Sequence, residues 1–158
     1  MNIYSLADNI VRRRHNTVTN NDGINKHAAC IFDKNNTPIS YGINHVNDLN
    51  KNSKDDSIHA EQHAFINAPN NNKKKLKDVN LLVVRYNKSF NLTNSFCCDR
   101  CIKSFGDLRK KGYRLKKVYW STENGEIICQ KANILIDLPK EDRYFTKIDR
   151  KLAVRNNL

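Results

Sequence analysis

Two short segments of the chain carry side chains that could bind a metal ion and move protons. The first is His59-Ala60-Glu61 and the second is Cys98-Asp99-Arg100-Cys101. Zinc prefers imidazole nitrogen and thiolate sulfur in tetrahedral sites, and three protein ligands leave one position for water. A glutamate two residues from the histidine is well placed to handle that water's protons. We therefore predict a zinc site with His59, Cys98 and Cys101 as ligands and Glu61 as the proton-transfer group.

These side chains converge only if the elements that carry them have a particular arrangement. Two residues advance a helix by about 200°, so His59 and Glu61 come together only where the amino end of their helix abuts the site. Cys98 and Cys101, three residues apart, share one face of a helix. At a helix start, the dipole and the free N–H groups favour the thiolate form of Cys98. The spacing thus predicts two helices whose amino ends point at one ion.

The first part of the chain predicts a helix followed by a hairpin. Apolar residues from Ile3 to Val11 fall on one helix face. Arg12 to Arg14 would close this helix, where cations suit the dipole, and phosphate binding is the alternative use of these arginines. Residues 27–32 and 39–43 flank a turn-forming stretch, the pattern of two paired strands.

The middle of the chain alternates between predicted helices and strands. A polar stretch, residues 47–57, predicts a loop, and His59 begins a helix that stops near Ala68 because proline follows. A buried, parallel-type strand over residues 79–86 comes after a basic loop. The second motif then opens a helix that ends before Gly112. The strand at 118–120 completes a right-handed crossover, which makes it parallel to strand 79–86.

Length and composition indicate one domain. At 158 residues the chain suffices for a single core, with an N-terminal helix and loop in residues 1–24 and a charged tail in 139–158. Residues 126–129 and 134–138 are each a short strand or helix, and the tail is a final helix or disordered. We expect no membrane association, because the longest aliphatic run is only Leu81 to Val84.

The cysteines and the N-terminal residues indicate the cellular compartment in which we expect the protein. The five cysteines, an odd number with two adjacent, do not form a disulfide framework. The start lacks the basic and apolar regions of a signal peptide. We expect a cytoplasmic or other reducing intracellular location, with Cys30 and Cys129 as small buried apolar residues.

The net charge of +12 favours a polyanionic partner or a phosphorylated substrate. The basic runs fall around and after the metal motif, at residues 73–77, 109–111 and 114–117. Asn and Lys also abound in proteins of AT-rich genes, so a solvated basic surface is the plainer alternative. Lys73 to Lys77 follow the far end of the helix that His59 begins, about 15 Å away. We therefore expect these lysines not to touch a small phosphorylated substrate bound at the metal site.

The ordered pair His-x-Glu and Cys-x-x-Cys is the signature of zinc deaminases acting on nucleobases. At this point the chain resembles the cytidine and deoxycytidylate deaminase superfamily over roughly residues 25–128. The resemblance is carried by His59-Ala-Glu-Gln-His-Ala and the run from Asn80 to Lys88. It is also carried by Cys98-Asp-Arg-Cys-Ile and by the run from Val118 to Gly125.

The resemblance implies an α/β fold of the cytidine deaminase type, with three α/β/α layers and a central five-stranded mixed sheet. It implies one catalytic zinc held by His59, Cys98 and Cys101, with Glu61 as proton shuttle. By position, Asn44 looks like the family's asparagine that contacts the substrate sugar. The implied activity is hydrolytic removal of the amino group from the cytosine of a nucleoside or nucleotide, namely cytidine, deoxycytidine or their monophosphates.

Several residues keep alternative roles. The family usually has proline before the first cysteine, whereas this chain has Cys97, which competes with Cys98 as a ligand. His63 is a packing residue or a further ligand. His27 lines the pocket or belongs to the core. Trp120 or Tyr119 stacks on a base, with the other in the core because a strand alternates.

Other functions stay open at this point. Single-stranded DNA or RNA is the alternative substrate, because basic tracks and aromatic platforms suit it. A different base also stays open, because pocket shape rather than the metal motif selects it. A non-catalytic nucleic-acid-binding protein would use the zinc for structure and would need a fourth ligand from Cys97 or His63. Association of the chain with copies of itself into a homo-oligomer also stays open.

Overall fold

The computed structural model describes residues 2–17, 26–46 and 57–143. Its main sheet has the strand order β2 (Pro38–Ile43), β1 (Lys26–Phe32), β5 (Lys77–Tyr86), β7 (Tyr113–Ser121) and β8 (Ile127–Lys131). A short strand, β6 (Leu92–Thr93), pairs with β5 beyond this path. Strands β5 and β7 run parallel, whereas the other pairs run antiparallel. The expected five-stranded mixed sheet and its parallel crossover are confirmed.

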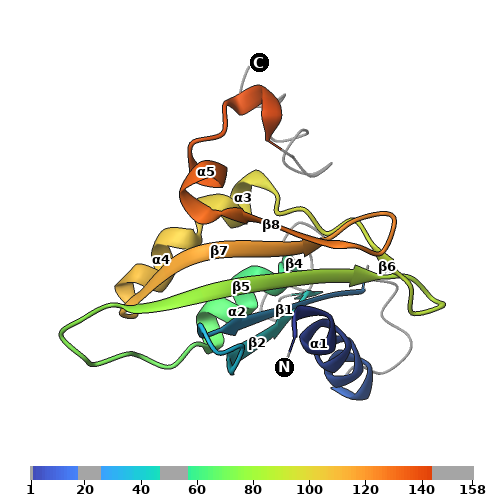
Figure 1. The fold of residues 1–158 in the computed structure, drawn as a ribbon, viewed down its shortest axis with the longest axis horizontal. Coiled ribbons are helices and arrows are strands. Elements are labelled where there is room, and N and C mark those ends of the chain that lie inside the picture. Colours follow the sequence, from blue (N-terminus) through green and yellow to red (C-terminus); the bar gives the residue numbers. More distant parts are fainter. Residues whose placement is uncertain (1, 18–25, 47–56, 144–158) are drawn as a thin grey trace.

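Helices cover both faces of this sheet (Figure 1). Helix α1 (Ile3–Thr17) packs on one face through Leu6 and Ile10, against the strand residues Ala28 and Leu82. The other face carries α2 (Ala60–Asn67), α3 (Asp99–Lys103), α4 (Phe105–Lys110) and α5 (Ala132–Ile136). Alternate residues of the central strands point to the two faces, and because both faces are covered, residues 28–32 of β1 and 81–84 of β5 are all buried. The three-layer α/β/α arrangement is therefore confirmed.

The helix α2 lies close on strand β2 because Gly42 has no side chain. A Cβ atom at Gly42 would collide with the Ala60 carbonyl and the Ala64 amide of this helix. Side chains of the same helix also occupy the outer edge of β2. The Asn67 amide donates to the Tyr41 carbonyl at 2.9 Å, and the Ile43 amide donates to His63 Nδ1 at 3.1 Å. Strand β2 and the whole length of α2 are thus held as one unit.

Several boundaries differ from those expected. Helix α1 continues to Thr17, so the arginine triplet lies within it, and Arg14 is buried with only 2% of its surface exposed. The expected third helix is divided into α3 and α4 at Ser104. Its end before Gly112 is confirmed, with this glycine at φ 90°.

The two ambiguous segments become strand β8 and helix α5. The expectation for Cys129 was wrong: it is exposed, because β8 is an edge strand whose burial is incomplete. The tail begins with a 3-10 turn, η2 (Lys140–Asp142), and residues 144–158 lie outside the described part. Most of the loop expected at 47–57 is also outside it, apart from Ser57, which pairs in the small sheet β3 (His45–Val46) and β4 (Ser57–Ile58). None of the described helices is long and apolar enough to cross a membrane.

Candidate metal centre and active site

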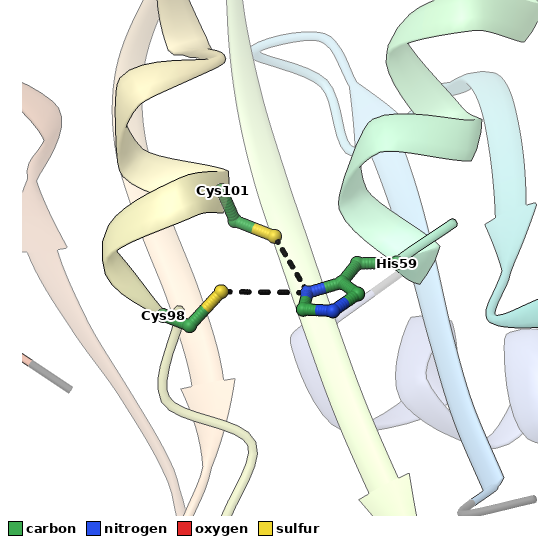
Figure 2. A group of neighbouring side chains, drawn as sticks. All are labelled: His59, Cys98 and Cys101. Carbon is green, nitrogen blue, oxygen red and sulfur yellow. Dashed lines mark hydrogen bonds between the residues drawn. The ribbon is translucent and has the colours of Figure 1, made fainter. Parts of the chain in front are cut away.

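His59, Cys98 and Cys101 come together between the starts of two helices (Figure 2). His59 is the N-cap residue of α2, and Cys98 is the N-cap residue of α3. Their ligand atoms, with that of Cys101, all lie within 4.8 Å of one another. The Nδ1 atom of His59 is 3.2 Å from Cys101 Sγ and 3.4 Å from Cys98 Sγ. This is the arrangement that the spacing of the two motifs predicts.

The start of α2 is held in a conformation that points His59 into the cluster. The backbone of His59 is extended, with φ −75° and ψ 155°, and its amide donates to Gln62 Oε1 at 3.2 Å. An extended residue before a helix breaks the helical rotation. His59 and Glu61 therefore avoid the separation of about 200° that they would have inside a helix.

The segment before Cys98 is fixed by two buried serines. The Ser95 hydroxyl donates to the Val83 carbonyl of β5 at 2.8 Å, and the Ser95 amide donates to the Ser121 carbonyl of β7 at 2.9 Å. The Ser121 amide donates back to Ser95 Oγ at 2.9 Å. Because both serines are buried, these bonds tie the approach to α3 to the carboxyl ends of the parallel strands.

The electrostatics of the cluster favour a thiolate. The hydrogen bond from the Cys101 thiol, with the neighbouring His59, lowers the pKa of Cys98 to about 4. The same bond to Cys98 raises the pKa of Cys101. The hydrogen bond with Cys98 raises the pKa of His59. One sulfur is therefore already held in the form that binds metals.

Glu61 lies beside the cluster as a buried acid. It is 4% exposed, and its Oε2 atom has no hydrogen-bond partner among the described residues. Burial raises the pKa of its carboxyl group, although a hydrogen bond from its own backbone amide, the nearby His59 and a hydrogen bond with Cys97 oppose this. A buried carboxyl oxygen without a partner is costly, so its presence here points to a role beyond folding.

The donor set fits a zinc ion. One imidazole nitrogen and two sulfurs gather at a single point, and these are borderline and soft ligands. Cys97 and His63 do not belong to this group. His63 accepts a hydrogen bond from the Ile43 amide and packs its ring against His45, with centroids 4.5 Å apart. The geometry therefore groups the three ligands that the sequence favours.

Asn44 and His27 are joined to each other and to α1. The Oδ1 atom of Asn44 accepts from the His27 amide at 3.1 Å and from Arg14 Nη2 at 3.3 Å. Arg14 Nε also donates to the His27 carbonyl at 3.0 Å. Burial, followed by the charges of Arg85, His59 and Arg14, lowers the pKa of His27 to about 4. Arg14 was missed as a site residue because its burial depends on where α1 packs.

Trp120 lies on the sheet face covered by α2 and α3, half-buried against the core. Its ring makes an edge contact with Phe96, with centroids 5.1 Å apart. Tyr119 points to the opposite face and packs on Phe32. The expected alternation of these two aromatic residues is confirmed, and only Trp120 shares a face with the cluster.

The comparisons with known proteins agree with this geometry. Residues 8–117 match the family described as the cytidine and deoxycytidylate deaminase zinc-binding region. The chain belongs to this family. The matched range includes both helix starts and all three ligand atoms of the cluster, so the family's zinc-binding description and the observed donor set coincide. No curated protein sequence matches the chain.

Two crystal structures show the same fold. The cytidine deaminase from Burkholderia pseudomallei is 14% identical, with a TM-score of 0.55, and the match covers 91% of this chain and 100% of that one. The cytidine deaminase from Mycobacterium leprae is 15% identical, with a TM-score of 0.52, over 87% of this chain and 99% of that one. The cytidine deaminase-like fold is thereby confirmed.

Proposed function

We propose that the protein is a zinc-dependent hydrolase that deaminates the cytosine base of a nucleoside or nucleotide. Cytidine, deoxycytidine and their monophosphates are the candidate substrates. The observation that carries this proposal is a buried carboxyl oxygen without a partner, on Glu61, beside three converging zinc-type ligands. Family membership and the shared fold support it.

His59 Nδ1 and the sulfurs of Cys98 and Cys101 would hold the zinc ion. Zinc, when bound, would lower the pKa of a water molecule to roughly 7 and so make a nucleophile available at neutral pH. Cys98, with its depressed pKa, already carries the negative charge that a zinc ligand needs. The serine-tied approach to α3 would keep both sulfurs in place while substrate enters.

Glu61 would carry the protons of the reaction. Its carboxylate would accept a proton from the attacking water and deliver it to the ring nitrogen of cytosine. It would then take the second proton from the oxygen now bonded to the ring carbon and give it to the departing amino group as the carbon–nitrogen bond breaks. Cytosine and water thus become uracil and ammonia, and Glu61 returns to its starting form. Burial suits this role, because a raised pKa brings the carboxyl closer to neutral pH.

The substrate contacts would come from Asn44, His27 and Trp120. Arg14 fixes the amide of Asn44, so that this side chain would meet the sugar in one orientation. His27 stays neutral near the base, and the ring of Trp120 would form an apolar wall. In the sheet register Arg85 is opposite His27, on the face covered by α2 and α3, which adds a cation near the site for a phosphorylated substrate.

The competing interpretation is a zinc site that serves structure alone. The two interpretations differ in whether Glu61 is needed for turnover. The test is ammonia release by the purified zinc-loaded protein, measured with cytidine, deoxycytidine, their monophosphates, adenosine, guanine and single strands. We expect Glu61→Gln to keep its zinc and fold while losing about 10²–10⁴-fold in turnover, because one carboxylate serves several proton transfers. Turnover at the wild-type rate in this variant would exclude Glu61 from the mechanism.

A further inference from the structure

The turn between β5 and β6 holds an aromatic residue in a strained conformation. Phe90 has φ 62°, in the left-handed region that bulky side chains avoid. Its side chain is also 48% exposed, so burial in the core does not offset the strain. Strained residues of this kind are often found at functional sites. The question is therefore why an aromatic ring occupies this position.

The chain contains the same turn a second time, with a less strained residue at this position. In the β1–β2 turn, the amide of Asn36 donates to the Asp33 carbonyl, and the amide of Asp33 donates to the Thr37 carbonyl. In the β5–β6 turn, the amide of Phe90 donates to the Asn87 carbonyl, and the amide of Asn87 donates to the Asn91 carbonyl.

In each turn, the side chain of the first residue also accepts hydrogen bonds from two backbone amides. Asp33 Oδ1 does so in the first turn and Asn87 Oδ1 in the second. Asn36, at φ 60°, shows that asparagine fills the strained position. The turn therefore requires a left-handed residue but does not require phenylalanine.

Cationic and aromatic groups surround the exposed ring. The Tyr86 ring lies nearly parallel to it, with an interplanar angle of 14° and centroids 5.8 Å apart. The Lys26 ammonium is 5.7 Å from the centroid of Phe90, and His15 makes an edge contact with centroids 5.0 Å apart. Lys88 is exposed in the same turn. An exposed flat ring beside cations is the combination that holds a base and its phosphate.

This group of residues lies at the same end of the sheet as the metal cluster. Tyr86 directly follows Arg85 at this end of β5, and it points to the face covered by α1, whereas Arg85 and His27 share the face of the metal cluster. From the turn, the chain returns through β6 and the serine-tied segment to Cys98. Figure 1 shows this turn at the end of the molecule opposite the loop between α2 and β5.

We propose that Phe90, with Lys26 beside it, is a stacking platform for a base of single-stranded nucleic acid. The net charge of +12 complements such a partner. This inference goes beyond the proposed deamination, because it concerns binding alone and needs no turnover. Failure of one proposal therefore leaves the other standing.

The test is binding of DNA and RNA single strands of about 15 nucleotides by the full chain. Phe90→Asn copies Asn36, so we expect a melting temperature no lower than wild type and an affinity reduced about five- to hundredfold. Phe90→Tyr should keep the affinity. Lys26→Gln should flatten the log–log salt dependence by about 0.7. Ile66→Asn, which removes another exposed apolar side chain, from α2, is the matched control and should bind normally.

Three outcomes would overturn the proposal. One is wild-type protein that does not retain single strands, and another is an unchanged affinity in Phe90→Asn. The third is equal affinity for duplex, whose bases are not available for stacking. Should Phe90→Asn fail to fold, Phe90→Leu removes the flat ring while keeping an apolar side chain, and the same affinity loss is expected.

Discussion

Cys97 and Cys98 are consecutive residues with different surroundings. The Cys98 backbone is extended, with ψ 165°, so successive side chains diverge. Cys98 faces His59, whereas Cys97 is buried, hydrogen-bonded to Glu61, and has its pKa raised by burial. The thiol that replaces the family's usual proline therefore lies against the acid rather than among the ligands.

This difference predicts the zinc content of two neighbouring variants. Cys98→Ala should lose most of its zinc, because a ligand disappears from a three-residue cluster. Cys97→Ala, the matched control, should keep one zinc per chain. Metal analysis of both purified proteins measures this. Full zinc in Cys98→Ala together with a loss in Cys97→Ala would reverse the ligand assignment.

His27 predicts how stability depends on pH. Its pKa of about 4 in the folded chain lies below the ordinary 6.5, so the unfolded chain binds more protons between these values. Stability from neutral His27 is present above pH 6.5 and is lost as pH falls towards 4, by up to about 3 kcal/mol. Denaturant unfolding of wild type and His27→Gln should show a shallower acid loss in the variant. Parallel pH profiles would refute this.

The sequence predicts the ligands but not the residues that support them. His59, Cys98 and Cys101 are identified by side-chain chemistry at short spacing. Arg14 contacts Asn44 across thirty positions, and Ser95 contacts Ser121 across twenty-six. Such contacts depend on how helices and strands pack, and no local pattern records that packing.

At the scale of elements, the short helix α3 is stabilised from the C-terminal segment. Arg143 Nη1 pairs at 2.8 Å with Oδ1 of Asp99, the residue directly after Cys98. The same guanidinium donates to the carbonyls of Ile136 and Leu138. Asp99 is 7% exposed in its side chain, so its carboxylate depends on these partners. The segment after α5 is thus attached to the start of the metal-binding helix.

Removing this attachment should destabilise the fold. Arg143→Ala leaves a buried carboxylate with one exposed partner, Lys103, and should lower the free energy of unfolding by about 1–3 kcal/mol. Lys140→Ala, on the same segment and exposed, should change it little. Chemical denaturation compares the two. Equal stability of both variants would show that the ion pair contributes nothing.

Element types were more predictable than element ends. Strand β5 is a long apolar run bounded by polar loops, so its position followed from composition. The sequence predicts too short an α1, because a run of arginines suits a helix end, whereas the buried Arg14 donates to the His27 carbonyl and the helix continues to Thr17. The break at Ser104 had no signal, since Phe105 and Leu108 continue the apolar spacing.

At the scale of the molecule, basic residues gather at both ends of the sheet. Strand β5 has ten residues, which is about 33 Å. Lys77 starts it, whereas Arg85, opposite His27, lies near its end. The lysine-rich loop before β5 is therefore at the end of the sheet away from the metal cluster (Figure 1).

This separation predicts the effect of removing the loop's charge. Changing Lys73, Lys74, Lys75 and Lys77 together to Gln should leave the zinc content and the kcat/KM for a monophosphate unchanged. Steady-state kinetics with zinc analysis measures both. A collapse of monophosphate activity in the quadruple variant, with zinc intact, would mean that the loop reaches the substrate.

The side chains of α2 along β2 also limit how copies of the chain can associate. An open edge strand is a template for pairing with another strand, and it is the usual starting point of β-type aggregation. Here Asn67 and His63 already occupy the Tyr41 carbonyl and the Ile43 amide. Strand addition at this edge would require breaking those bonds. At the other end of the main strand order in the described structure, β8 carries the exposed Ile128 and Cys129, so strand addition by a second copy is easier at that edge than at β2.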